Sequence, residues 1–277
     1  MKNYYIFAFA AFSFMLVACS SPENNPSTDW EMYDLRGKVK ELHIKIFDAR
    51  MAFGELTKTQ ISESCDIYFN EDGKISKRYT YFGDTEKPKE EIFTYSEKQY
   101  VHTTYMNGTI KDKCIVTYTD WGATESVIWY TAEGKDSSKV EWTYNDKKQI
   151  VEMSWYQKNV LEAKNKFYEY NNQGLITKYI SYDEDGDLDD TYLQTWDRNK
   201  RITSYGVYDK TGDLRYSHLF EYNEKGFCSK LIFKYKLDDE GYATEFSYVY
   251  DDKGNYINKY IISEYSKSIE ERTIVYY

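Results

Sequence analysis

Apolar and polar residues alternate along most of this chain with a period of two residues. In residues 242–250, one face carries Tyr, Thr, Phe, Tyr and Tyr, and the other carries Ala, Glu, Ser and Val. Residues 214–222 repeat this arrangement, with Leu, Tyr, His, Phe and Tyr on the aromatic face. Alternation of this kind predicts β-strands, because successive side chains of a strand point to opposite faces. The aromatic face of each strand is expected to be buried.

A regular sequence repeat organises these strands. An aromatic residue precedes a short polar turn at Phe69, Tyr95, Tyr118, Tyr144, Tyr170, Trp196, Tyr222 and Tyr250. A second series lies between them, at Tyr105, Tyr130, Tyr156, Tyr182, Tyr208 and Tyr235. The successive intervals from Tyr118 through Tyr222 are identical in length, so each repeat holds two turns and two strands.

The turns share one chemistry. In most copies an Asn or Asp opens the turn and a Gly closes it, as Asn171 and Gly174 do. The Asn or Asp side chain can accept hydrogen bonds from the turn backbone, and Gly adopts the positive φ that the turn needs. Gln99, Lys148 and Lys200 replace this Gly in three copies, which predicts looser turns or another turn type there. Strands joined by turns this short must be antiparallel.

These patterns predict an all-β domain over residues 61–277. We expect an antiparallel meander of two-stranded hairpin repeats, each of about 26 residues, that forms a long curved or coiled sheet. Residues 30–60 precede the repeats and alternate cleanly over 38–47. We interpret 38–47 as an opening strand that caps the array, with a loop near 49–54, because an end strand leaves backbone groups unpaired.

Two copies of the repeat, residues 182–188 and 208–214, read Tyr-Asp-x-x-Gly-x-Leu. In this motif the chain resembles the YD-repeat (Rhs-type) family, and loosely matching copies extend the resemblance over roughly residues 60–277. The resemblance implies β-hairpin architecture and points to the short YD-repeat lipoproteins of Gram-negative envelopes. Large Rhs proteins enclose a toxin within such a sheet. That role is not expected here, since no toxin domain or self-cleavage motif follows the last repeat.

The N-terminus carries a secretion signal. An apolar run over residues 4–18 follows Met1-Lys2, which predicts a signal peptide at 1–18, with a helical apolar core too short to span a membrane. The run ends in Leu16, Val17, Ala18 and Cys19 and resembles the lipobox of bacterial lipoproteins. This resemblance implies that Cys19 receives a diacylglycerol and becomes the first residue after cleavage. The alternative is an ordinary signal peptide with a chance cysteine.

Residues 19–29 are expected to form a disordered tether, because they are polar and contain two of the chain's three prolines. Ser20 follows the cysteine, and by resemblance to lipoprotein sorting this favours the outer membrane. The periplasmic face and the cell surface both remain open. The membrane, reached through the lipid, is therefore one expected partner.

Charge and cysteine content exclude several classes of partner and cofactor. The net charge of −10 at pH 7 repels nucleic acid. Beyond the lipobox only Cys65, Cys114 and Cys228 remain, which is neither a disulfide framework nor a zinc site. We expect no cofactor. The chain is also rich in tyrosine, with 31 residues, which favours strands.

Catalytic and metal-binding motifs are weak. His43, His102 and His218 lie on expected strands in unrelated contexts, which favours packing or surface roles. Weak calcium ligands are Asp183, Asp185 and Asp187. Gly186 is the fourth residue of that turn and not the sixth that an EF-hand loop needs, so a plain solvated turn is favoured.

A membrane-spanning barrel is excluded on the pattern of charges. Residues 161–170 place Asn165 and Glu169 on one face and Glu162, Lys164 and Lys166 on the other, and neither face could lie in hydrocarbon.

We therefore predict a lipid-anchored envelope protein with a non-catalytic β-repeat domain for protein or glycan binding, or for scaffolding. The candidate binding surface is Trp121, Trp129, Trp142 and Trp155, since aromatic rings stack on sugars and contact peptides. The alternative is that these rings fill the core, except Trp121, which lies at a turn. The alternative function is an envelope enzyme, for example one like a glycoside hydrolase, that uses scattered carboxylates.

Overall fold

The computed structural model describes residues 28–83, 87–235 and 240–277. The predicted signal peptide and lipobox lie outside these residues, as does most of the predicted tether. The described chain contains one short helix, α2 (Asp29–Met32), and an 18-stranded antiparallel sheet. The strands are β1 (Val39–Ala52), β2 (Glu55–Phe69), β3 (Ile75–Phe82), β4 (Lys89–Tyr95), β5 (Gln99–Met106), β6 (Thr109–Tyr118), β7 (Thr124–Thr131), β8 (Asp136–Tyr144), β9 (Ile150–Gln157), β10 (Val160–Tyr170), β11 (Ile176–Tyr182), β12 (Leu188–Trp196), β13 (Ile202–Asp209), β14 (Leu214–Tyr222), β15 (Cys228–Lys234), β16 (Tyr242–Tyr250), β17 (Tyr256–Ser263) and β18 (Lys267–Tyr276).

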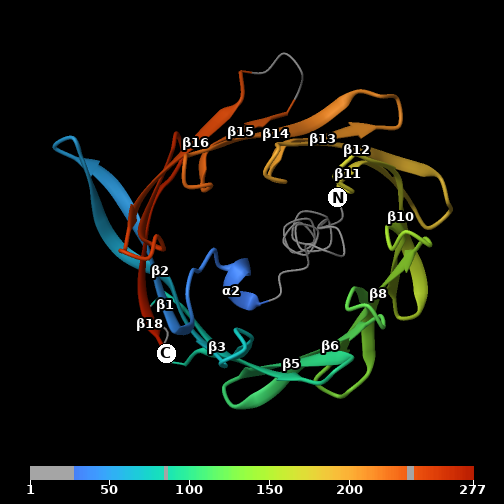
Figure 1. Ribbon diagram of the computed structural model, residues 1–277, viewed down its shortest axis with the longest axis horizontal. Coiled ribbons are helices and arrows are strands. Elements are labelled where there is room, and N and C mark those ends of the chain that lie inside the picture. The colour runs from blue at the N-terminus through green and yellow to red at the C-terminus, as the bar shows by residue number, and fades with distance from the viewer. Residues whose placement is uncertain (1–27, 84–86, 236–239) are drawn as a thin grey trace.

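The sheet closes into a barrel (Figure 1). Each strand pairs with the next along the chain, and β1 pairs with both β2 and β18. The meander was predicted correctly, but the long curved or coiled sheet was wrong. Closure satisfies the backbone groups of both edges that an open sheet would leave unpaired. The strand expected at 38–47 is present as the longer β1, and it closes the barrel instead of capping an array.

Closure also overturns the YD-repeat resemblance. The sequence predicted a long curved or coiled repeat sheet, whereas here the first and last strands are hydrogen-bonded partners, with Ile44 opposite Arg272. The Tyr-Asp-x-x-Gly-x-Leu copies describe a turn and its flanking strands. Such a local motif suits any antiparallel meander, so it does not distinguish a coiled sheet from a barrel.

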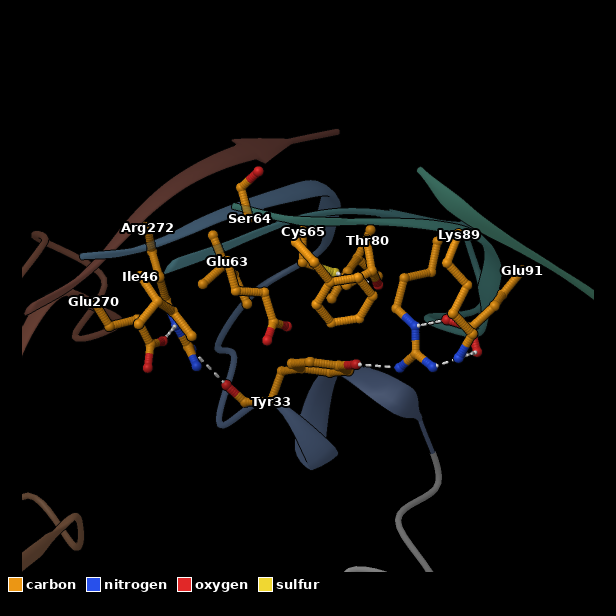
Figure 2. Close-up of a pocket in the computed structure, with 14 residues that line it drawn as sticks. Tyr33, Ile46, Glu63, Ser64, Cys65, Thr80, Lys89, Glu91, Glu270 and Arg272 are labelled. Atoms are coloured by element: carbon orange, nitrogen blue, oxygen red, sulfur yellow. Dashed lines mark hydrogen bonds and ion pairs between the residues drawn. The ribbon is translucent and has the colours of Figure 1, made fainter. Parts of the chain in front are cut away.

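In most strands the aromatic face forms the inner wall; β3 is an exception, since Tyr79 lies opposite Glu90 on the outer wall. α2 lies inside the ring, and Cys65 and Thr80 point toward it (Figures 1 and 2). Strand pairing shows which residues face inward together. Arg78 lies opposite Glu91, and the register followed around the barrel leads to the stacked pair of Tyr179 and Tyr192 and then back to β1. Among the most deeply buried side chains on this wall are Leu42, Val127, Tyr179 and Val207.

The outer wall carries ion pairs in its central strands. Register places Lys139 and Glu141 there, where they form an ion pair, and Lys164 pairs with Glu152 in the same way. The outer wall also carries apolar side chains, such as Leu219, which lies opposite Ile232. Separately, no helix within the described residues is long and apolar enough to span a membrane.

The turn chemistry follows the sequence with one instructive exception. Asn171 Oδ1 accepts hydrogen bonds from the backbone N–H groups of residues 173 and 175, and Gly174 has φ of 77°. Lys148 and Lys200 take the same left-handed conformation, with φ of 60° and 63°, so the expectation of different turns was wrong at both. The pairing of the strands that these turns connect outweighs a backbone strain of roughly 1–2 kcal/mol at each of the two residues. The Gln99 turn does differ, with Ser96 N–H donating to the Gln99 carbonyl.

The aromatic repeat has a structural purpose. We call the barrel end that holds the turns after the even-numbered strands the tyrosine rim. There, an aromatic side chain near the end of an even strand donates a hydrogen bond to a carbonyl 20 residues earlier, at the start of the preceding strand. The donor and acceptor pairs are Tyr144 and Thr124, Tyr170 and Ile150, Trp196 and Ile176, Tyr222 and Ile202, and Tyr248 and Cys228. Each bond fastens the open end of a hairpin whose turn lies at the opposite rim.

We predict that Tyr222→Phe lowers the free energy of unfolding by about 1 kcal/mol, because it removes one such hydrogen bond and leaves the Ile202 carbonyl without that donor. The control is Tyr208→Phe, since the described residues include no hydrogen-bond partner for that hydroxyl. Urea titration of both variants measures the difference. Equal losses would show that the ring, and not the hydroxyl bond, stabilises the rim.

Candidate functional site

The segment that enters the barrel, residues 28–38, is fastened to the inner wall at the tyrosine rim. Asp29 N–H donates to the Gly73 carbonyl at 2.7 Å, and the Asp29 carboxylate accepts a 2.6 Å bond from Ile75 N–H. Trp30 packs over the same turn and donates its indole N–H to the Val39 carbonyl. A Cβ at position 73 would lie 2.6 Å from the Trp30 ring, and the φ there is 78°, so this position requires glycine.

The far end of this segment is held by Asn255, which is completely buried. Its side chain accepts a 2.5 Å bond from Arg36 N–H and donates a 3.0 Å bond to the Arg36 carbonyl. It also donates to the Tyr276 hydroxyl at 2.6 Å. Because both ends of the segment are fixed to the wall, Tyr33 between them has a defined position.

A cavity of about 390 Å³ lies between Tyr33 and the inner wall (Figure 2). It is lined by side chains of β1, β2, β3, β4 and β18, and Figure 2 shows charged groups at both ends of the Tyr33 ring. The described lining includes three carboxylates, Glu63, Glu91 and Glu270, and three cations, Arg78, Lys89 and Arg272. Charged groups that face inward among aromatic rings are costly unless they are paired.

Glu91 is the centre of one charged cluster. Only 1% of its side chain is exposed. Arg78 donates two hydrogen bonds to the carboxylate, at 2.5 and 2.8 Å. A side-chain nitrogen of Lys89 and one of His102 each lie 2.9 Å from a carboxylate oxygen. Burial raises the pKa of Glu91, but the hydrogen bonds from His102 and Arg78 outweigh it and hold the pKa well below its usual range. The carboxylate therefore stays ionised.

Arg272 and Glu270 form the second cluster. Arg272 Nε donates to Glu270 at 2.7 Å, and the Arg272 guanidinium lies 3.6 Å from the centre of the Tyr256 ring. Tyr256 also donates its hydroxyl proton to Glu270 at 3.0 Å. Tyr33 joins the two clusters, since its carbonyl accepts a 2.9 Å bond from Arg272 and its hydroxyl accepts a longer one from Arg78.

Two further groups line the cavity between these clusters. Glu63 points into it (Figure 2), and among the described residues no cation pairs with this carboxylate. Cys65 lies beside Thr80, and burial raises the pKa of its thiol to about 11. The thiol is therefore protonated at neutral pH and is a poor nucleophile.

The structure separates the four predicted tryptophans. Trp142 is buried, and Trp129 and Trp155 pack against the same cluster with their ring centres 6.1 Å apart. Trp121 is 42% exposed at the tyrosine rim, where its ring contacts Tyr144 edge-on and lies under Lys148. The positions of Trp129, Trp142 and Trp155 match the alternative that these rings fill the core. A binding role for any of them stays a prediction.

The remaining predicted residues have local roles. Asp183 accepts bonds from the backbone N–H groups of Asp185 and Asp187, as a turn residue does. No group of three or more metal-ligating side chains occurs in the described ranges. The described cysteines are free. His43 lies on the outer wall beside Asp66, and His218 packs among aromatic rings.

Sequence reasoning missed the cavity residues, among them Arg78, Glu91, Glu270 and Arg272. A signal was present in β3 and β4, where Arg78 and Glu91 fall in the phase of the strand that faces inward. Charged residues in that phase of two adjacent strands point to a buried pair. In β18 Glu270 lies opposite Lys259 of the adjacent β17, which is a signal of the same kind, whereas the pairing of β18 with β1 joins the two ends of the described chain and gives no local signal.

No protein-family model and no curated protein sequence matches this chain. Among solved structures, a porin-like protein from Bacteroides uniformis is 11% identical, with a TM-score of 0.46, over 86% of this chain and 96% of that one. A porin-like protein from Bacteroides vulgatus is also 11% identical, with a TM-score of 0.31, over 84% and 97%. A putative outer membrane lipoprotein-sorting protein domain from Vibrio parahaemolyticus is 7% identical, with a TM-score of 0.16, over 85% and 83%.

These comparisons add no support for a YD or Rhs repeat, and none of them bears on lipidation. Cys19 and the rest of the lipobox lie outside the described residues, so lipid attachment remains a prediction from the sequence.

Proposed function

We propose that this chain is a lipid-anchored protein of the bacterial envelope whose barrel binds a ligand without transforming it, in the cavity beside α2. The observation that carries the proposal is the preformed charged wall of that cavity. Arg78, Glu91, Glu270 and Arg272 are fixed by one another and by Tyr33, so the wall loses little freedom when a ligand enters. Binding sites are typically concave and largely preformed in this way.

The ligand is expected to carry a cation or several hydroxyl groups. Glu63 is the cavity carboxylate that has no cation beside it in the described structure, so an amine or a set of hydroxyl donors would complete its hydrogen bonding. A glycan or an exposed protein segment supplies such groups. The volume, about 390 Å³, suits a few sugar rings or one or two side chains.

A non-catalytic role agrees with the chemistry of the cavity. A general acid needs a pKa near the working pH, whereas Glu91 has its pKa lowered by its partners. Burial raises the pKa of two described carboxyl groups, Asp34 and Asp190, and the pKa of Asp190, at about 6, is the observation that favours the enzyme alternative. Its neighbour across the strands, Asp209, is committed to turn hydrogen bonds with residues 211 and 213. The pair therefore lacks a second free carboxylate.

The test begins with a glycan array and a pull-down from envelope extract, using the protein purified from membranes. We expect Glu63→Gln to weaken the captured interaction at least tenfold, since a charged hydrogen bond contributes roughly 1.5–3 kcal/mol. Asp185→Asn, at an exposed turn, is the matched control and should bind as the parent does. Mass spectrometry of the N-terminal peptide tests the lipid on Cys19.

The variant Trp121→Ala distinguishes binding in the cavity from binding at the tyrosine rim. Loss of binding in Trp121→Ala with full binding in Glu63→Gln would move the site to the tyrosine rim and contradict the cavity. If neither screen captures anything, binding is not the function. Turnover of a glycan that stops in Asp190→Asn would establish the enzyme alternative instead.

A further inference from the structure

One end of the cavity carries an excess of positive charge. Arg78 and Lys89 both contact the single carboxylate of Glu91, so one cation is left without a matching carboxylate. Each guanidinium nitrogen of Arg78 already has an acceptor, on Glu91 or Tyr33. The Lys89 ammonium carries several N–H donors, and the described structure gives it one acceptor, a Glu91 oxygen at 2.9 Å. Lys89 is therefore the group at this end that can bind an anionic group of a ligand.

The other end of the cavity carries an excess of negative charge. Glu270 and Arg272 form an ion pair there and balance each other. Glu63 adds a carboxylate that no cation of the described chain contacts, and it points into the cavity (Figure 2). An ammonium group is the cation that a carboxylate in such a position binds with a strong hydrogen bond. The two ends therefore select opposite charges.

The lining beside Glu63 is apolar. Ile46 and Phe82 lie opposite Glu63 on the two neighbouring strands, and Ile44 lies opposite Cys65. All of these side chains line the cavity. Aliphatic and aromatic groups provide no hydrogen-bond partner, so this part of the lining suits an apolar part of the ligand that lies next to its cationic end.

Strand register sets the distance between the two ends. Cys65 lies opposite Thr80, and Thr80 lies opposite Lys89, so Lys89 is two strands away from β2. Glu63 precedes Cys65 by two residues and shares its face of β2. Strands lie about 4.8 Å apart and rise about 3.4 Å per residue, which separates the α-carbons of Glu63 and Lys89 by about 12 Å. Lys89 contacts Glu91, on the side away from Glu63, so the two charged groups stay about that far apart.

This distance limits the length of a ligand that touches both ends. An extended peptide spans at most about 3.5 Å per residue, and a hydrogen bond at each end adds about 3 Å. One amino acid therefore reaches about 10 Å at most, which is too short, whereas two or three residues reach about 13 to 16 Å. The cavity volume of about 390 Å³ is near the lower limit for ligand pockets, so a long chain does not fit.

We propose that the cavity binds a free peptide of two or three residues, with its N-terminal ammonium at Glu63 and its C-terminal carboxylate at Lys89. This inference rests on the proposed binding function and narrows its ligand. A neutral glycan supplies hydroxyl groups but brings no counter-charge to either end. An internal segment of a protein has neither terminus, so it lacks the pair of charges that the two ends select.

Isothermal titration calorimetry of the protein purified from membranes tests the two peptide termini separately. The probes are the tripeptides Ala-Leu-Ala, Ala-Ser-Ala and Ala-Phe-Ala, each also prepared with an acetylated N-terminus and with an amidated C-terminus. We expect a free tripeptide to bind and each blocked form of it to bind about tenfold or more weakly, because each block removes one charge-assisted hydrogen bond. Free leucine, which cannot reach both ends, should bind more weakly than the free tripeptide.

Two variants assign the termini to their residues. Glu63→Gln should weaken binding of the free tripeptide about tenfold or more and abolish its advantage over the acetylated form, but not over the amide. Lys89→Met should abolish the advantage over the amide alone, and it leaves Glu91 bound by Arg78. Lys77→Met, on the outer wall, is the matched control and should bind as the parent does. Each variant is compared with itself across two ligands, so a general loss of stability cannot imitate this result.

The outcomes separate this inference from the function on which it rests. Equal affinity of the parent for free and blocked tripeptides would overturn it, as would a Glu63→Gln variant that still prefers the free N-terminus. A glycan or protein captured through Glu63, together with no binding of any tripeptide, would leave the proposed function standing and overturn the peptide. If nothing binds in the cavity, both fail.

Discussion

Glu91→Ala is expected to destabilise the barrel by about 3–5 kcal/mol, because it leaves Arg78 in the inner wall without its carboxylate partner. The same change removes the acceptor for Lys89 and His102. Glu91→Gln keeps the shape of the side chain and one carbonyl oxygen, so it should lose less stability than Glu91→Ala. Chemical denaturation monitored by circular dichroism measures all three proteins.

The matched control is Glu90→Ala. Glu90 is the adjacent residue, but it lies on the outer wall and pairs with Lys77 at 3.4 Å in solvent. Exposed ion pairs contribute at most about 1 kcal/mol, so this variant should unfold close to the parent. Equal losses in the two variants would mean that burial of Glu91 has no special effect.

The pH dependence follows from the direction of the Glu91 pKa. Its pKa is lower in the folded protein than the ordinary value of 4.5, so the stabilisation is fully present above that value. It is lost as the pH falls below 4.5, since the folded carboxylate must then take up a proton. Glu91→Ala should therefore show a weaker loss of stability in acid than the parent.

Asp190→Asn is expected to raise the free energy of unfolding at pH 7 by on the order of 2–3 kcal/mol. Burial raises the pKa of Asp190 from 3.8 to about 6, and the Arg215 guanidinium only partly opposes this. Between those two values the folded protein binds more protons than the unfolded chain, so stability falls as the pH rises. Above pH 6 the folded state carries the whole penalty of a buried charge, and asparagine removes it.

Unfolding measured at pH 5, 6, 7 and 8 tests this prediction. The advantage of Asp190→Asn should be roughly half of its full size at pH 5 and reach its full size by pH 7. Asp189→Asn is the control, because that side chain is 55% exposed and its removal should change stability little. A lower stability of Asp190→Asn at pH 7 would show that the 2.9 Å pair with Arg215 outweighs burial.

The cavity residues show where prediction from the sequence stops. The inward phase of most strands could be read from alternation, but not that of β3, where Tyr79 lies opposite Glu90 on the outer wall and Arg78 faces inward. The contacts of Tyr33 could not, because Arg78 and Arg272, which bind its two ends, lie on β3 and β18, far apart in the sequence. The four tryptophans were ambiguous for the same reason. Alternation places a ring on the inner face but does not show whether neighbouring rings cover it.

The sequence by itself determined the strands, the turns and the antiparallel order. These depend on contacts within one hairpin, such as Asn171 with the backbone two and four residues later. Even the aromatic repeat is local, since Tyr222 reaches back only 20 residues. The tertiary structure decided closure, the position of α2 and the cavity. Each requires pairing between distant segments, as in β1 with β18, and that pairing depends on how the twist and curl of all eighteen strands add together.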